Sequence, residues 1–500
     1  MNFDQESMGV RISMPVIRRE VNSDISEDYT LPDYYPEIRK LLFARPSPLL
    51  PAKFVSGTKV DVSGVVDYTL IYLSADGKLC SAPLSAEYSF SLPVENMNEF
   101  ELGEGLDVMA HTVAESTSVR VSAPRRIQLR SHLRTSLSVF GKKLCAERIT
   151  GLCEGADIER LRAKSESCEL LCESSDVISL EDSFELGENE RIALADGIVS
   201  LKDQRLCGEV IRFDGEILIW MLAEAQDGAQ REISRRLPLS AEIELDGVSL
   251  PENAGVRASG YLTDLSINVE EGRVSISADA VIEVCACTNR EFEYTKDAYS
   301  VSQKSECEMA ERSVPICSLN ANSSLSLCER MSLEELGYPP DARPLEAFAT
   351  ASVDSVSLED GKYVLRGTCR YSVISMRDGE YVAGEFSVPF RYERDAGDEA
   401  SAPFCFDGVA TVRDAKVKAE SDALCFECEL LLSATVIGEQ RISMLEKIEL
   451  SDKEEQRSGE LIVCYPQGDD TLWSVAKRYS VLREEISGDP ASDAFVIIEA

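Results

Sequence analysis

Histidines are few in this chain of 500 residues, and the spacing of its cysteines does not favour a metal site. His111 and His132 are its two histidines, which excludes a metal centre built on several histidines and leaves one of these two for any Ser-His triad. Cys425 and Cys428 have the spacing of half a zinc knuckle, but no second CxxC pair completes a tetrahedral site. Residues three apart on a strand also point to opposite faces. We therefore expect no metal site and a buried Cys428.

Motifs for catalysis are equally scarce. The sequence contains no phosphate-binding loop, nucleophile elbow or paired-carboxylate signature. The Asp-Gly dipeptides at 76–77, 227–228 and 378–379 lack the alternating acidic ligands and the final Glu of an EF-hand calcium loop. We expect a protein that is not an enzyme and that uses no cofactor.

A row of cations interrupts the acidic sequence. The formal net charge is -38, yet the segment from Thr117 to Cys145 contains no Asp or Glu. Within it, cationic side chains occupy one parity and apolar side chains the other, which on a strand places the cations in solvent and the apolar residues on a core. The cationic row consists of Arg126, Arg130, His132 and Arg134. It is either a solvated face or a docking surface for acidic groups on another unit, a second copy or a partner protein.

The overall charge and hydropathy restrict the other classes of partner. A chain this acidic is repelled by nucleic acid and by anionic membrane surfaces, so we expect neither as a partner. The longest apolar run, Ile217 to Ala223, is too short to cross a bilayer, which needs about 20 residues. The first residues have no apolar signal-peptide region. These features predict an intracellular protein with reduced thiols and no membrane insertion.

The elements that position these residues are organised by an internal repeat. Asp76-Gly77, Asp227-Gly228 and Asp378-Gly379 each lie between two extended apolar stretches, and each dipeptide follows the previous one by 151 residues. Asp-Gly between such stretches is typical of a β-hairpin, because Gly tolerates positive φ. The equal spacing predicts three units of about 150 residues.

Alternating apolar residues indicate that each unit is rich in β-structure. A strand-like segment precedes each hairpin, ending at Leu31, Leu186 and Leu333, and a second alternating strand follows it. We expect a mainly β protein in which each unit is a sandwich-like antiparallel module of five to eight short strands. The expected boundaries are 1–153, 154–310 (divergent) and 311–450 for the repeats, 451–460 for a linker and 461–500 for a different C-terminal module.

The last 40 residues have a mixed pattern. Leu461 to Tyr465 reads as a strand, and Leu472, Val475, Ala476 and Tyr479 fall on one face of a helix that Asp470 can cap. A short second helix over about 482–486 and a strand over 494–498 complete a predicted βααβ order.

This tail resembles a LysM domain through GDDTLWSVAKRYSV and the REEI that follows it. The resemblance implies a shallow groove for N-acetylglucosamine-containing glycan between two loops, or protein docking at the same place. The groove would use Gly468, Asp469, Asp470, Thr471, Leu472, Trp473, Gly488, Asp489 and Pro490. Trp473 lies off the apolar stripe, so it is a sugar-stacking residue, a partner anchor or a lid over the tail's core.

The repeats resemble the SPOCS-domain, SipL-like spore coat morphogenetic proteins of endospore-forming bacteria. The first unit carries LPDYYPEIRKLL and VSGVVDYTLIYL, and the third carries GYPPDARPLEAF and LRGTCRYSVISM. The resemblance implies a non-enzymatic scaffold in the mother-cell cytosol that recruits or tethers a spore coat morphogenetic ATPase, or another coat protein, to the forespore surface. The alternative is a protein that binds peptidoglycan or chitin oligomers through its LysM tail, as a wall-associated or phage structural component.

Overall fold

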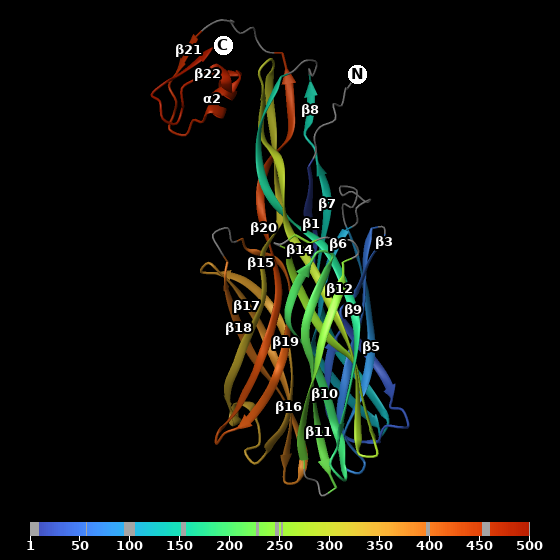
Figure 1. The fold of residues 1–500 in the computed structure, drawn as a ribbon. Coiled ribbons are helices and arrows are strands. Elements are labelled where there is room, and N and C mark those ends of the chain that lie inside the picture. The colour runs from blue at the N-terminus through green and yellow to red at the C-terminus, as the bar shows by residue number, and fades with distance from the viewer. Residues whose placement is uncertain are drawn as a thin grey trace.

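The computed structural model describes residues 10–56, 58–94, 106–151, 157–226, 230–245, 250–251, 254–396, 401–452 and 461–499. The protein is mainly β, with 81% strand in several antiparallel sheets. Its strands run along one long axis, with the small C-terminal module beside one end (Figure 1). None of the helices among these residues is long and apolar enough to span a membrane.

The first unit contains two sheets. One has the order β1-β7-β6. In the other, β2 and β3 pair with successive parts of one edge of β4, and β5 pairs with the opposite edge. Its strands are β1 (Val10–Thr30), β2 (Ile38–Pro48), β3 (Ala52–Ser56), β4 (Lys59–Ser74), β5 (Leu79–Pro93), β6 (Leu106–Ala123) and β7 (Arg126–Cys145).

The second unit repeats this arrangement with the sheets β13-β14-β9 and β10-β11-β12. Its strands are β9 (Ile158–Glu185), β10 (Glu190–Cys207), β11 (Val210–Ala225), β12 (Gln230–Glu244), β13 (Gly255–Glu270) and β14 (Arg273–Ser300).

The third unit has the sheets β15-β20-β19 and β16-β17-β18. Its elements are β15 (Lys304–Ser332), the short helix α1 (Leu333–Leu336), β16 (Arg343–Glu359), β17 (Lys362–Arg377), β18 (Glu380–Asp395), β19 (Pro403–Ala419) and β20 (Ala423–Ser451). In all three units the first strand therefore pairs with the last, and the middle strands form the second sheet.

The hairpin turns agree with the sequence wherever they are described. Gly77 has a φ of 76°, and Asp378 and Gly379 have φ values of 49° and 79°, the positive angles that a tight Asp-Gly hairpin requires. Asp227 and Gly228 lie outside the described residues.

The expectation of short strands was wrong. β9 has 28 residues and β15 has 29. The first–last strand pair of each unit continues through a register shift, at Pro15/Ile17, Ala286/Cys287 and Cys317/Leu319. Such a bulge bends and twists a strand without ending it, so these pairs extend beyond the body into a narrower stalk (Figure 1). β8 (Arg148–Gly151) joins the stalk by pairing in parallel with β20.

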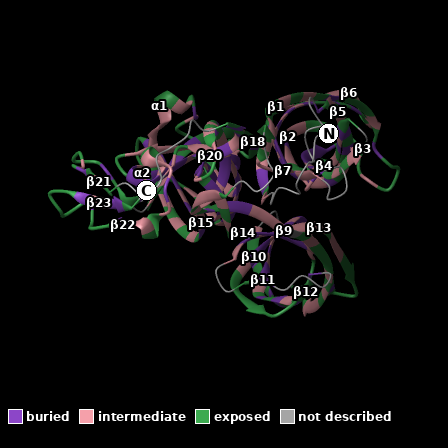
Figure 2. Cartoon of the chain, turned by 90° about the horizontal axis from the view of Figure 1, so that it is seen from above, coloured by how far each residue is buried: buried purple, intermediate pink, exposed green. Residues whose placement is uncertain are grey.

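Apolar clusters between the units join them into one body. Seen from above, the units lie side by side around a common axis (Figure 2). Near the hairpin ends, Phe43 of the first unit, Leu222 of the second and Phe348 of the third belong to one buried cluster. Further along the axis, a second cluster joins Phe140, Cys287 and Ile437, again one from each unit.

Strands that meet the axis are buried on both faces. Leu70, Ile71, Tyr72 and Leu73 on β4 are all buried, although alternate residues point to opposite sides of the sheet. One face packs inside the first unit and the other packs in the cluster shared by all three units. A continuous apolar run, here YTLIYL, is therefore the sequence feature that corresponds to contact between units.

An ion pair between the second and third units is buried near the axis. Arg257 Nε on β13 lies 2.6 Å from Asp407 Oδ2 on β19, and the side chains are only 2% and 11% exposed. Arg257 also donates a hydrogen bond to Ser259 Oγ at 3.1 Å. Removing one partner of such a pair leaves a buried, unpaired charge.

We expect Asp407→Ala to lower the free energy of unfolding by about 3–5 kcal/mol, because Arg257 then stays buried without its counter-charge. The double variant Arg257→Met plus Asp407→Leu should recover most of this loss. Urea unfolding of the full chain measures both. Glu393→Ala breaks the exposed pairs with Arg391 and Lys362 and should cost no more than about 1 kcal/mol. An Asp407→Ala variant as stable as that control would contradict the role of the buried pair.

Candidate functional site

The C-terminal module is anchored to the stalk through Trp473. It contains β21 (Leu461–Cys464), α2 (Leu472–Tyr479), a 3-10 turn (Arg483–Glu485), β22 (Ile486–Ser487) and β23 (Val496–Glu499). Trp473 is 9% exposed and packs edge-on against Tyr299 of β14, with ring centroids 5.0 Å apart. Its Nε1 donates a hydrogen bond to Asp297 Oδ2 at 2.9 Å. Trp473 therefore covers the core of the tail, one of the three roles left open for it, and also anchors the tail to β14 of the same chain.

Further polar contacts fix the module on the end of the second unit. Lys477 Nζ pairs with Asp297, and Tyr299 Oη donates to the carbonyl of Val481 at 2.8 Å. Arg483 lies over the Trp473 ring and 3.4 Å from Glu159 of β9. The contact therefore combines a buried aromatic pair with charged groups at its edge.

The module differs from the expected βααβ order. The second helix is a single 3-10 turn followed by the short strand β22, so no clear βααβ unit is present. The buried helical face includes Trp473, Val475 and Ala476, while Leu472 is 37% exposed. Trp473 belongs to a buried cluster that contains both the core of the module and Tyr299 of β14.

Most of the predicted groove residues organise loops. Asp470 is buried and accepts hydrogen bonds from the Gln467 amide at 2.9 Å and from Arg478. Thr471, rather than Asp470, caps α2 by accepting from the Ser474 amide at 3.2 Å.

The second predicted loop is held mainly by Asp489. Its carboxylate accepts hydrogen bonds from the Ala491 amide at 3.0 Å and from Ser492 Oγ at 2.9 Å. Gly488 adopts a φ of 109°, and Pro490 is buried. Gly468 and Asp469 form an exposed turn. These contacts leave Leu472 as the exposed apolar side chain of the predicted set.

An exposed apolar strip lies on the same module, and the sequence did not single it out. Leu461, Val463 and Tyr465 are 71%, 51% and 72% exposed, and they alternate along β21 and the residue after it. Phe495, 49% exposed, contacts Tyr465 with ring centroids 6.4 Å apart. We call Leu461, Val463, Tyr465 and Phe495 the tail strip. Among the described strands β21 pairs only with β23, so it is an edge strand.

The cationic row lies on β7, and two of its four members have acidic neighbours. β7 is central in its sheet, so β1 and β6 supply carboxylates on both sides. His132 Nδ1 lies 2.7 Å from Asp24, and Arg134 Nε donates to Glu115 at 2.6 Å. Arg126 and Arg130 are exposed and form no ion pair with any described residue. The face that the sequence predicted to be cationic is therefore half neutralised within the chain.

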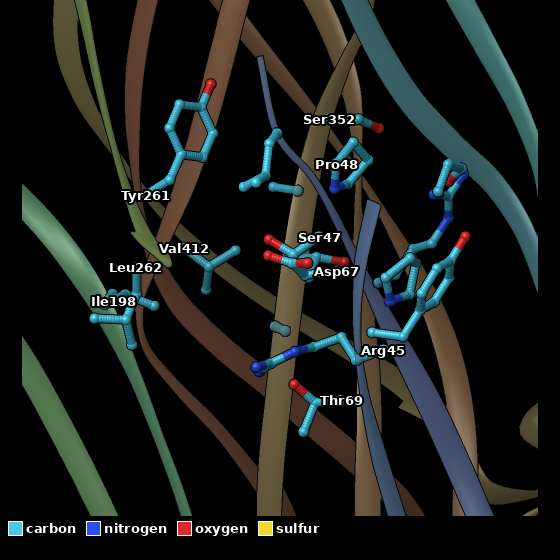
Figure 3. Close-up of a pocket in the computed structure, with 18 of the residues that line it drawn as sticks. Arg45, Ser47, Pro48, Asp67, Thr69, Ile198, Tyr261, Leu262, Ser352 and Val412 are labelled. Atoms are coloured by element: carbon cyan, nitrogen blue, oxygen red, sulfur yellow. The ribbon is translucent and has the colours of Figure 1, made fainter. Parts of the chain in front are cut away.

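A cavity of about 770 Å³ lies between the three units. Side chains from all three units line it, including Arg45, Asp67, Ile198, Tyr261, Ser352 and Val412 (Figure 3). Its charged groups have partners within the chain. Arg45 pairs with Asp196, and Arg370 donates to the carbonyl of Ala114 at 2.6 Å. The arrangement is consistent with a polar space where sheets of different units meet.

Two titratable groups, His111 and Glu283, lie near the Arg257–Asp407 pair. Burial lowers the pKa of His111, which lines the cavity. Burial raises the pKa of Glu283 on β14 to about 7, against the attraction of Arg257. Glu283 Oε2 has no hydrogen-bond partner among the described residues. The sequence did not indicate this cluster, because its members come from distant strands.

Comparisons with family models, with curated proteins and with solved structures found no match to this chain.

We expect the tail to detach when its anchor is removed. In a Trp220→Phe background Trp473 is the remaining tryptophan. Asp297→Ala plus Tyr299→Ala removes the acceptor for Trp473 Nε1 and its ring partner, so the Trp473 fluorescence should shift to the red. Glu293→Ala, on the same strand but paired with Arg162, is the control. Unchanged emission in the anchor variant would contradict the docked arrangement.

Glu283 should make stability depend on pH. Its folded-state pKa of about 7 lies above the ordinary glutamate value of 4.5, so the folded state binds this proton more tightly than the unfolded state. The stabilisation is complete below about pH 4.5 and is lost as the pH rises through about 7. Glu283→Gln should therefore gain about 3 kcal/mol relative to the wild type between pH 4.5 and pH 8.

Urea unfolding across this pH range measures the effect. Glu87→Gln, at an exposed position of β5, is the matched control and should follow the wild-type profile. If the difference between Glu283→Gln and the wild type stays constant with pH, Glu283 does not titrate in this window.

Proposed function

We propose that the chain is a non-enzymatic scaffold of the sporulating mother cell, with three SPOCS-like β-repeats and a LysM-like tail that docks a coat protein. In this role it helps to recruit or tether the basement layer of the spore coat to the forespore surface. The resemblance of LPDYYPEIRKLL and VSGVVDYTLIYL to SPOCS-domain proteins supports this assignment. The observation that carries the docking role is the orientation of the tail, with Trp473 bound to the body and the tail strip in solvent.

The tail strip has the properties of a protein-binding surface. Its aromatic pair, Tyr465 and Phe495, offers a large apolar area with few rotatable bonds. The edge strand β21 carries backbone groups that can pair with a strand from a partner. A peptide added there would contact the alternating Leu461, Val463 and Tyr465 side chains directly. We infer that the docking partner, a coat morphogenetic ATPase or another coat protein, binds by adding a strand to β21.

The body supports docking by holding the tail at one end. The Trp473, Lys477 and Arg483 contacts attach the tail to β14 and β9, which belong to the stalk. A fixed tail loses less conformational freedom on binding than a tethered one. Arg126 and Arg130, which form no ion pair with the residues that the structure describes, provide a second contact for an acidic surface, including that of another copy of this chain.

Glycan binding is the alternative function. Trp473, the side chain best suited to stack on a sugar, is occupied by Asp297 and Tyr299. Leu472 and the Gly468–Asp469 turn remain exposed in the predicted groove. Protein docking would use the tail strip and glycan binding would use the predicted groove, so each surface can be changed by mutation without the other.

Localisation in sporulating cells tests the docking role. A fluorescent fusion of the full chain carrying Val463→Asp plus Tyr465→Asp should be diffuse in the mother cell, whereas the wild type should surround the forespore. Charges on the strip oppose burial against an apolar partner. Val177→Asp plus Val269→Asp changes two exposed valines of the second unit and should localise normally.

A strip variant that still surrounds the forespore would contradict docking through this surface. Binding of chitin oligomers by the full chain, lost in Leu472→Asp but retained in the strip variant, would favour the glycan function.

A further inference from the structure

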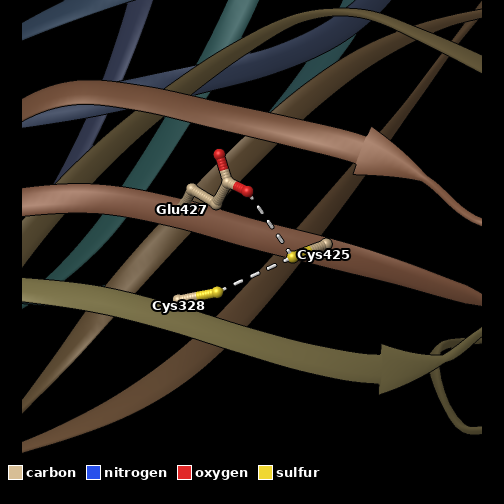
Figure 4. A group of neighbouring side chains, drawn as sticks. All are labelled: Cys328, Cys425 and Glu427. Carbon is tan, nitrogen blue, oxygen red and sulfur yellow. Dashed lines mark hydrogen bonds between the residues drawn. The ribbon is translucent and has the colours of Figure 1, made fainter.

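A cysteine pair and a carboxylate meet on the outer face of the third unit. β15 pairs with β20 so that Cys328 lies opposite Glu427. Two residues further along each strand, Arg330 lies opposite Cys425. Cys328, Cys425 and Glu427 share one face (Figure 4). Cys428 is buried on the other face, 3.9 Å from Cys369, as its sequence spacing predicted. The second thiol for Cys425 therefore comes from a strand about 100 residues earlier.

The distances fit a tetrahedral metal site. The Cys328 and Cys425 sulfurs are 3.9 Å apart, and Cys425 Sγ is 3.9 Å from Glu427 Oε1. A tetrahedral zinc ion with Zn–S bonds of about 2.3 Å holds its two sulfurs about 3.8 Å apart. All three ligand atoms lie within 4.8 Å of one another. A cation could therefore be bound with small movements of the side chains.

Lys418 orients the carboxylate and balances the charge. Its Nζ donates to Glu427 Oε2 at 2.6 Å, which leaves Oε1 facing the thiols. Such outer contacts commonly fix the ligands of metal sites. Two thiolates, one carboxylate, one divalent cation and the lysine ammonium sum to zero charge. Cys328 is exposed, so the site has an entry path and a fourth position open to water.

We propose that Cys328, Cys425 and Glu427 bind a thiophilic divalent cation, Zn²⁺ being the best match in ligand type and spacing. Binding replaces the two thiol protons, which pass to solvent, and forms two metal–sulfur bonds and one metal–oxygen bond. The site joins β15 to β20 on the face of their sheet opposite to the buried Cys428. It is independent of the docking role proposed for the tail.

Titration of the reduced full chain with Co²⁺ tests the site, because cobalt reports thiolate ligands by charge-transfer absorption. The wild type should bind one Co²⁺ with this absorption, and Zn²⁺ should displace it. Cys328→Ser and Cys425→Ser should each weaken binding at least tenfold. Cys207→Ser changes an exposed cysteine elsewhere and is the matched control. Urea unfolding of the metal-free variants verifies that they are folded.

Glu427→Gln tests the third ligand. It should weaken Co²⁺ binding about tenfold or more while the thiolate absorption persists at saturation, because both sulfurs remain. Absence of thiolate absorption in the wild type, or wild-type affinity in the Cys328→Ser plus Cys425→Ser double variant, would overturn the site. Unchanged affinity in Glu427→Gln would overturn the three-ligand assignment.

Discussion

Burial of side chains along the common axis is the constraint on which the rest of this molecule depends. Each unit has two sheets and an interior of its own, but β4, β11 and β17 also bury residues on the side that faces the other units. In isolation a unit would expose Ile71, Leu222 or Ile374 to water. The buried Arg257–Asp407 pair adds a directional contact, because the second unit supplies the cation and the third unit supplies the anion. The repeats therefore complete one another's cores.

The stalk follows from the same arrangement. The first and last strands of each unit continue past their bulges, and their outer parts contact strands of the other units. Ile12 of β1, Val314 of β15 and Ile442 of β20 share one buried cluster. Further out, Ile149 of β8 packs against Ile448 of β20. This continuous support reaches the end of β14, where Asp297 and Tyr299 anchor Trp473. The position of the tail strip in solvent thus depends on contacts that begin in the body.

Local patterns in the sequence correctly predicted individual strands and turns. Alternation along residues 273–284 indicated the strand that the structure has there, and the Asp-Gly dipeptides at 76 and 378 form the expected turns. The predicted strand lengths were too short. A bulge within a strand and a turn after a strand both interrupt the apolar alternation with polar residues, so the sequence does not distinguish them. Contact between the units could have been predicted from runs such as YTLIYL. In such a run apolar and polar residues do not alternate, because both faces of the strand are buried.

Contacts between distant segments could not be predicted. Trp473 lies off the predicted helical stripe, and its contact with Tyr299 of β14 joins two segments that are distant in the sequence. The approach of Cys328 to Cys425 depends on the register of two long strands, which one residue of slip would abolish.

The central claim is that three repeats form one cooperative body. Hydrogen exchange of the full chain along a urea series tests it most directly, because amides of β4, β11 and β17 report one strand in each unit. The account predicts that these three strands lose protection together, at one urea concentration. Loss of protection at three separate concentrations would show that the units unfold independently and would contradict it.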